Sequence, residues 1–378
     1  IYFINVNGQI TQQVNALMVI NAQRMKNRCG MVYFAALAVM AVQMSNHWMV
    51  SSHSTDVLPA VCSAVAASYL ARLLLDARRD DGGRGREALL VTALLATAVC
   101  GKLTAAPFAI AASMLMVGWW LRAQSPGGVR AALIAGAAAG LLLGPWVAHG
   151  LILSGWALYP LPVLGADVEW RVPADVVRRE WHYITRSGRS FGPLDRWASW
   201  TALARRWQRD ILFPVGVALA AAVALAALRL HRRIRTGGLW TMLLPVGAGI
   251  AVWLVVSPQR RLGFYLVWIA AATILAMLAW AAWPRPQRRT LTLLLALWAA
   301  LGVANLKKVY TPPAPGGFHP TPSAELRTVR TPSGLEVHVA PGGYCWDAPI
   351  PCTPNVRPGL RLRRVGDPSS GFRIIEPP

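Results

Sequence analysis

Long apolar runs that alternate with short clusters of arginine constrain this chain more than any other feature. Hydrophobic residues make up 55% of the 378 positions and charged residues only 14%, which leaves too little polar surface for a soluble globular protein. The arginines collect between the runs, as at Arg78, Arg79, Arg84 and Arg86. The sequence therefore predicts an all-α polytopic membrane protein.

The formal net charge of +22 comes from 38 Lys plus Arg against 16 Asp plus Glu. A balance this basic is also found in nucleic-acid-binding proteins. Here the basic residues lie in short segments between apolar runs, where the positive-inside rule expects cytoplasmic loops. The distribution favours a membrane protein and argues against a nucleic-acid partner.

Placing each inner arginine cluster in the cytoplasm predicts about nine transmembrane helices. The run 88–101 is shorter than the roughly 20 residues of an upright span, so we expect it to form a pinched or partly re-entrant hairpin with the next run. The predicted spans are 30–44, 57–75, 88–101, 103–121, 131–153, 211–228, 239–256, 264–283 and 290–306.

These spans divide the chain into segments. Residues 30–153 and 211–306 form the two groups of membrane helices, and residues 1–29 show no clear period and stay unassigned. The chain begins at Ile1 without an initiator Met or a signal-peptide pattern, which is typical of a piece of a longer protein.

Residues 154–210 are predicted to be a long extracytoplasmic loop. Its prolines and glycines indicate an ordered loop up to Pro173, after which Asp175 is expected to cap an amphipathic helix. Further on, Leu194, Trp197 and other apolar residues recur at helical spacing opposite arginines. A Trp stripe opposed by Arg is typical of a helix in the headgroup plane, so the segment is predicted to be a lid on the membrane surface.

Residues 307–378 are predicted to form a small extracytoplasmic tail that contains β-structure. Leu335, Val337 and Val339 alternate with polar residues, which indicates a strand. In an oxidising compartment Cys345 and Cys352 are expected to form a disulfide. The alternative is two unpaired thiols.

Asp56 is the first candidate functional residue, together with His53 on the same predicted outer loop. A carboxylate at the outer mouth of two spans can deprotonate an acceptor hydroxyl or hold a divalent metal. The alternative is an N-cap for the helix that contains Pro59. Both roles are compatible with the sequence, and no cofactor is specified by it.

Basic residues on the predicted outer side form the second set of candidates. Lys102 lies alone between two apolar runs, where an ammonium can bind a lipid-carrier phosphate or snorkel to the interface. Arg260 and Arg261 lie in a predicted outer turn, 257–263, against the positive-inside trend. They favour an anionic phosphate, or pairing with anionic lipid or with lid carboxylates such as Asp167 and Glu169. The chain contains no GxxxxGK[ST], GxSxG or HExxH motif, which argues against a soluble nucleotide-using site.

Three short motifs resemble the C-type glycosyltransferase superfamily: STDVLP around Asp56, GKLTAAP around Lys102, and the Pro-x-Arg-Arg turn that contains Arg260 and Arg261. The chain is also similar to uncharacterised bacterial multi-spanning proteins related to that superfamily, through SGWALYP, DVEWRVP and CWDAPIPCTP. The resemblance implies a transferase in the bacterial inner membrane that takes a sugar from a polyprenyl-phosphate donor on the outer face, with membrane lipid and this donor as partners.

The resemblance also implies roles for the lid. Arg178 and Arg179 would add positive charge near the donor phosphate, and Trp156, Tyr159 and Trp170 would offer flat surfaces to a sugar or prenyl chain. The superfamily's main catalytic carboxylate lies in a first outer loop that has no obvious equivalent here, and Asp56 matches a second, supporting one. Either the main base lies outside this sequence or transferase activity has been lost.

Two other classes of function stay open. A transporter or flippase, or a component of a lipid-linked glycan polymerase or ligase, would also use outer cations. A transporter should place ionisable groups near mid-membrane, often in repeated halves. A non-enzymatic envelope protein would use the lid only as an anchor.

Overall fold

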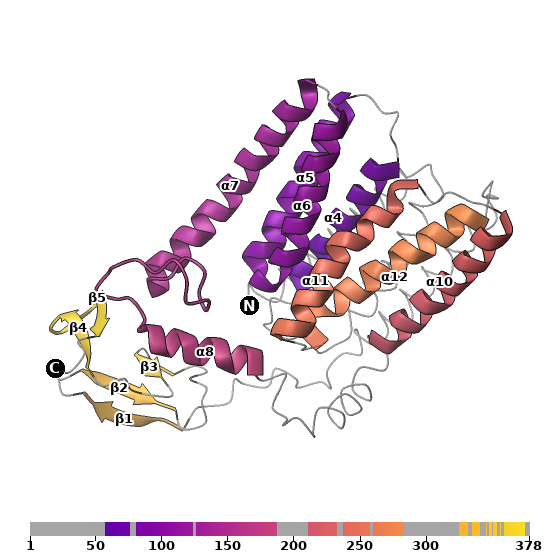
Figure 1. The fold of residues 1–378 in the computed structure, drawn as a ribbon. Coiled ribbons are helices and arrows are strands. Elements are labelled where there is room, and N and C mark those ends of the chain that lie inside the picture. The colour runs from indigo at the N-terminus through magenta and orange to yellow at the C-terminus, as the bar shows by residue number, and fades with distance from the viewer. Residues whose placement is uncertain are drawn as a thin grey trace, which may run out of the picture. The chain divides into compact units, whose positions relative to one another are not determined.

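The computed structural model describes two compact units of the chain, Ile1–Trp146 with His182–Tyr310 and Val147–Trp181 with Thr311–Pro378. Figure 1 shows helices in the first and small sheets in the second. The described residues are 57–75, 81–123, 126–186, 211–232, 237–257, 260–282, 325–331, 335–340, 345, 348–349, 351–353, 356 and 359–374. The predicted spans 30–44 and 290–306, the loop with His53 and Asp56, and the Trp stripe after residue 187 lie outside them.

The described part of the first unit is helical. α7 (Pro126–Ser154) continues from the first unit into the second, and α8 (Ala174–Arg186) runs from the second into the first. The other helices are α4 (Val57–Leu75), α5 (Asp81–Gly101), η1 (Leu103–Ala105), α6 (Ala106–Ala123), α10 (Phe213–Arg232), η3 (Gly237–Met242), α11 (Leu243–Val256) and α12 (Arg260–Ala282).

Three of the described helices are long and apolar enough to cross a membrane: Val57–Leu74, Leu103–Trp120 and Val129–Ser154. Shorter apolar helices cover Phe213–Leu228, Trp240–Val256 and Leu262–Leu278. The chain is thus mostly helical with several apolar helices, which is the architecture of a polytopic membrane protein. The number of nine spans stays a prediction.

Small residues let the helices of the first unit approach closely. Gly249 of α11 lies against Leu266 of α12 and Phe108 of α6, so that a Cβ at 249 would be 3.0 Å from Leu266 and 3.2 Å from Phe108. Gly263 of α12 lies under the Trp253 ring of α11, where a Cβ would overlap the indole. Glycine is therefore required where α6, α11 and α12 meet. Since α11 ends and α6 and α12 begin near these contacts, we call this end of the helices the Lys102 end.

α5 differs from the prediction in that it begins at Asp81 rather than Ala88. Its 21 residues match the length of a span, but the residues added before Ala88 are largely charged or glycine, and α5 is not among the described helices apolar enough to cross a membrane. The pinched or partly re-entrant hairpin stays a prediction. The charged first turns are accommodated by an ion pair between Glu87 and Arg72 of α4, at 3.1 Å, with side chains only 15% and 6% exposed. Each charge reduces the cost of burying the other.

α12 also begins earlier than predicted. The turn expected over 257–263 is wrong in its second half, because the helix starts at Arg260. Leu262, Phe264, Tyr265 and Leu266 are all buried. Burial of these four residues among neighbouring helices explains why the segment is helical rather than a loop.

The described part of the second unit combines the end of α7, the loop that follows it and two small sheets. β1 (Arg327–Arg330) pairs antiparallel with β2 (Glu336–Val339), which pairs in parallel with β3 (Cys352–Thr353). β4 (Leu360–Arg364) and β5 (Asp367–Ile374) form an antiparallel hairpin. The alternation that predicted a strand is confirmed, since Leu335 and Val337 are buried while Glu336 is exposed.

Candidate functional site

Lys102 occupies a break between α5 and the candidate span that begins at Leu103, as the sequence predicts. Its backbone is extended, with φ −162° and ψ 123°. Its N–H donates to the Ala98 carbonyl at 2.9 Å, and its carbonyl accepts from the Ala105 N–H at 3.0 Å. Non-helical backbone at a helix end places a lysine where its ammonium can reach the headgroup region. Binding of a phosphate there stays a prediction.

The start of α4 packs against this break. A Cβ on Gly101 would be 3.3 Å from atoms of both Leu58 and Pro59, so α4 begins directly beside the residue that precedes Lys102. Cys62, Ala98 and Ala105 form a small buried cluster beneath this contact. Asp56 directly precedes α4 in the sequence, but it lies outside the described residues, as does His53.

α12 adds two arginines at the Lys102 end, because Arg260 and Arg261 are its first two residues. The preceding Ser257 ends α11, with its N–H donating to the Trp253 carbonyl at 3.0 Å. The Ser257 hydroxyl donates to the Ile184 carbonyl in the last turn of α8, also at 3.0 Å. The end of α11 and the end of α8 are thereby fixed to each other.

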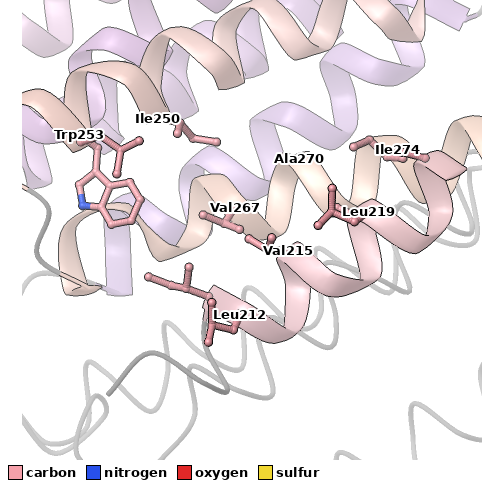
Figure 2. A pocket seen from close by; sticks show the side chains of 12 residues that line it. Leu212, Val215, Leu219, Ile250, Trp253, Val267, Ala270 and Ile274 are labelled. Carbon is pink, nitrogen blue, oxygen red and sulfur yellow. The ribbon is translucent and has the colours of Figure 1, made fainter. Parts of the chain in front are cut away.

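An apolar groove of about 400 Å³ lies where α10, α11 and α12 face one another. Figure 2 shows the side chains that line it, among them Trp253 of α11 and Val267 of α12. All its lining residues are apolar: Ile211, Leu212, Val215, Ala218, Leu219, Ala222, Ile250, Trp253, Leu254, Val267, Ala270 and Ile274. Because α12 rises about 1.5 Å per residue, Val267 lies roughly 10 Å along the helix from Arg260. The groove therefore begins in the half of these helices nearest the Lys102 end and extends past the middle of α12, to Ile274.

In the second unit, Trp156 anchors the loop that follows α7. Its indole N–H donates to the Val172 carbonyl at 2.8 Å, and its backbone N–H donates to the Ser154 hydroxyl oxygen at 3.1 Å. Gly165 packs on the ring, and Arg171 lies 5.9 Å from the ring centroid. Trp156 is buried, whereas Tyr159 is 40% exposed. Of these two predicted sugar or lipid contacts, Tyr159 is the more accessible.

Trp170 is held by the tail. The Arg363 guanidinium of β4 lies 4.8 Å from the centroid of the Trp170 ring, within the range of a cation–π interaction. The Trp170 indole nitrogen is buried and has no hydrogen-bond partner among the described residues. This contact joins the lid loop and the tail, two segments that the sequence treats separately.

α8 confirms the amphipathic helix that the sequence predicts. Val177 is fully buried, while Arg178, Arg179 and Glu180 are exposed. Asp175 is not the cap, because it lies one residue inside the helix and pairs with Arg179 at 2.7 Å. The Arg178 guanidinium donates to the Ala174 carbonyl at 3.2 Å. Both arginines are therefore accessible to an anion.

The tail contains the predicted disulfide, Cys345–Cys352, with Cα atoms 6.0 Å apart. It closes the segment that ends in β3, where the His338 N–H of β2 donates to the Pro351 carbonyl at 2.9 Å. Disulfides of this kind persist in oxidising compartments.

We expect the two sulfurs to resist alkylation in the exported, unreduced protein and to react after reduction. Intact mass measurement before and after reduction checks this. Alkylation at both positions without reductant would contradict the bridge. Cys62, which is buried and unpaired, is the control for a thiol protected by burial alone. Unfolding without reductant makes such a thiol reactive, whereas the sulfurs of a disulfide stay unreactive.

The structure divides the predicted site residues between the two units. Lys102, Arg260 and Arg261 belong to the first unit, at its Lys102 end, and Trp156, Tyr159, Trp170, Arg178 and Arg179 belong to the second. Among the described residues, no group of three or more His, Cys, Asp or Glu could hold a metal ion.

Sequence reasoning missed three features. The groove is formed by residues of three helices, and the Trp170–Arg363 contact joins distant segments, so neither leaves a local signal. The Arg72–Glu87 pair did leave a local sequence signal, because an arginine within the apolar run of α4 is unusual for a membrane span.

A family model described as a domain of unknown function (DUF8201) matches residues 2–268. No curated protein and no solved structure matches the chain.

Proposed function

The chain belongs to the DUF8201 family, whose description assigns no activity, and from its residues we propose an integral-membrane glycosyltransferase that uses a polyprenyl-phosphate sugar donor. The acceptor is a hydroxyl-bearing molecule of the cell envelope. The observation that carries the proposal is the apolar groove near the Lys102 end.

The groove suits a hydrocarbon chain because none of its lining residues is polar. In an aqueous protein such a groove would expose apolar surface, but among membrane helices it is open to a lipid chain. The donor chain occupies it, with the phosphate toward the start of α12. This arrangement fits a lipid whose hydrocarbon and phosphate are recognised at different depths.

Cations at the Lys102 end supply the charge that the leaving phosphate needs. Lys102 and the Arg260–Arg261 pair are at this end, and α4, α6 and α12 begin there. Helix N-termini favour anions as well. Arg178 and Arg179 of α8 belong to the second unit and are exposed, so each is accessible to a phosphate.

The reaction is displacement at the anomeric carbon. An acceptor oxygen forms the new bond to this carbon, and the bond from the carbon to the phosphate oxygen breaks. Asp56 takes the acceptor proton, assisted by His53, and polyprenyl phosphate leaves with the bond electrons. The cations stabilise the charge that develops on the phosphate.

The second unit supports an extracytoplasmic location for this chemistry. It contains both the lid loop and the disulfide-bearing tail, and a disulfide favours an oxidising compartment. We therefore propose nine spans in the bacterial inner membrane, with the second unit and the Lys102 end on the outer side.

The test is transfer by the purified full chain from a panel of polyprenyl-phosphate sugars. Ala218→Phe would place a ring in the groove and is expected to lower transfer at least about tenfold, since a filled groove leaves no space for the chain. Ala220→Phe is the matched control, because this residue lies on the same helix but outside the groove and is exposed.

Equal loss in both variants, or no transfer from any donor by the wild-type chain, would overturn the proposal. Binding of the donor without transfer would favour a flippase instead.

A further inference from the structure

The β4–β5 hairpin carries arginines in an arrangement that an internal role does not explain. Arg361 and Arg373 are directly opposite each other in the antiparallel pair, and both are exposed. Like charges directly opposite each other destabilise a strand pair. Among the described residues, no carboxylate lies within ion-pair distance of either. The pair is therefore available to an anion from outside this part of the chain.

The same hairpin is amphipathic. Leu362 is opposite Phe372, and Leu360 is opposite Ile374, so apolar residues alternate with the arginines along the strands. At the turn, Val365 is 95% exposed and is followed by Gly366 at φ +78°. Arg363 and Arg364 precede this tip, and Asp367 follows it opposite Arg364. An exposed apolar tip next to arginines is typical of a segment that touches the membrane interface.

The hairpin is linked to the end of an apolar helix through contacts within the second unit. The candidate span Val129–Ser154 ends at Ser154, whose carbonyl accepts from the Val172 N–H at 2.9 Å. Two residues earlier, Trp170 lies under the Arg363 guanidinium of β4. These contacts link the hairpin to the C-terminal end of the candidate span.

We propose that the β4–β5 hairpin docks on the membrane surface, where Arg361, Arg363 and Arg373 bind the phosphates of anionic phospholipid headgroups. Val365 reaches the boundary between headgroups and acyl chains. The headgroup region is only about 5–8 Å deep on each side, which a hairpin beside the helix end can reach. This surface is independent of the proposed transferase activity, and it holds the second unit against the bilayer.

The test places an environment-sensitive fluorophore on Val365→Cys in the full chain, with Cys29, Cys62 and Cys100 replaced by alanine. The chain is reconstituted in nanodiscs of phosphatidylcholine alone or with about one third phosphatidylglycerol. Each arginine near an anionic surface changes affinity roughly fivefold. Quenching by lipids that carry a nitroxide near the headgroup is expected to rise with phosphatidylglycerol and to fall in high salt.

Arg361→Glu with Arg373→Glu is expected to abolish the dependence on phosphatidylglycerol, while Arg361→Lys with Arg373→Lys should retain most of it. The lysine variant and formation of the Cys345–Cys352 bridge show whether the tail still folds. Quenching at position 365 that is absent in both lipids, or equal in both, would overturn the proposal. Displacement by inorganic phosphate at millimolar concentration would also overturn it, by indicating a site for a soluble anion.

Discussion

Asp56→Asn is expected to lower sugar transfer by about 10²–10⁴-fold, the usual contribution of a general base, while expression and folding stay unchanged. Asn is chosen because it caps a helix about as well as Asp does. The variant therefore removes the base but preserves a cap for α4, which begins at Val57. Initial rates of transfer in membranes, at saturating donor, give the measurement.

The same position separates the two roles that the sequence leaves open. Asp56→Ala should reduce transfer as strongly and also destabilise the protein by about 1 kcal/mol through loss of the cap. Full activity in the Asn variant together with lowered stability in the Ala variant would show that Asp56 is only a cap.

The second large effect concerns stability and involves the other end of α4. Glu87→Leu leaves the Arg72 guanidinium, which is 6% exposed, without its carboxylate partner. Removing one member of a buried ion pair costs about 3–5 kcal/mol. We expect a correspondingly large fall in the midpoint of unfolding in detergent, and the double variant Arg72→Leu with Glu87→Leu should recover most of it.

An exposed ion pair in the same chain provides the control. Arg179 and Asp175 are 2.7 Å apart, but their side chains are 72% and 59% exposed. Exposed pairs contribute about 0–1 kcal/mol, so Asp175→Asn should barely change the midpoint. A double variant at 72 and 87 that is as unstable as Glu87→Leu alone would contradict this explanation of the pair.

Local sequence signals predicted the local structure well. α4 has the predicted bounds because an apolar run ends where polar residues begin, and the break at Lys102 follows from a lone charge between two apolar runs. The strand at Val337 and the Cys345–Cys352 bridge were likewise visible as alternation and close spacing. Each of these features depends on residues close together in the chain.

Features that depend on partners from distant segments were not predictable. The early starts of α5 and α12 are stabilised by neighbours: Arg72 for the first and buried packing for the second. Periodicity contains no information about such neighbours. The lid loop and the tail share a unit through Trp170 and Arg363, a contact between residues far apart in the sequence.

The roles of the candidate residues depend on chemistry that the fold alone does not reveal. Lys102, Arg260 and Arg261 were singled out because charge is costly in an apolar setting. Their positions in the chain are at the Lys102 end of the helices, and their roles stay predictions. Trp156 shows the opposite case, since its burial makes it a support of the loop. An aromatic residue in a loop is either an exposed contact for a ligand or a buried support of the loop, and only its packing in the structure distinguishes the two.

The location of the second unit is the central claim, and thiol labelling in intact cells tests it most directly. Val163→Cys, at an exposed position in the lid loop, is expected to react with a membrane-impermeant maleimide before permeabilisation, in a chain whose Cys29, Cys62 and Cys100 are alanine. Arg86→Cys, exposed near the start of α5, should react only after permeabilisation. The reverse pattern would place the lid loop and the disulfide-bearing tail in the cytoplasm and contradict the account.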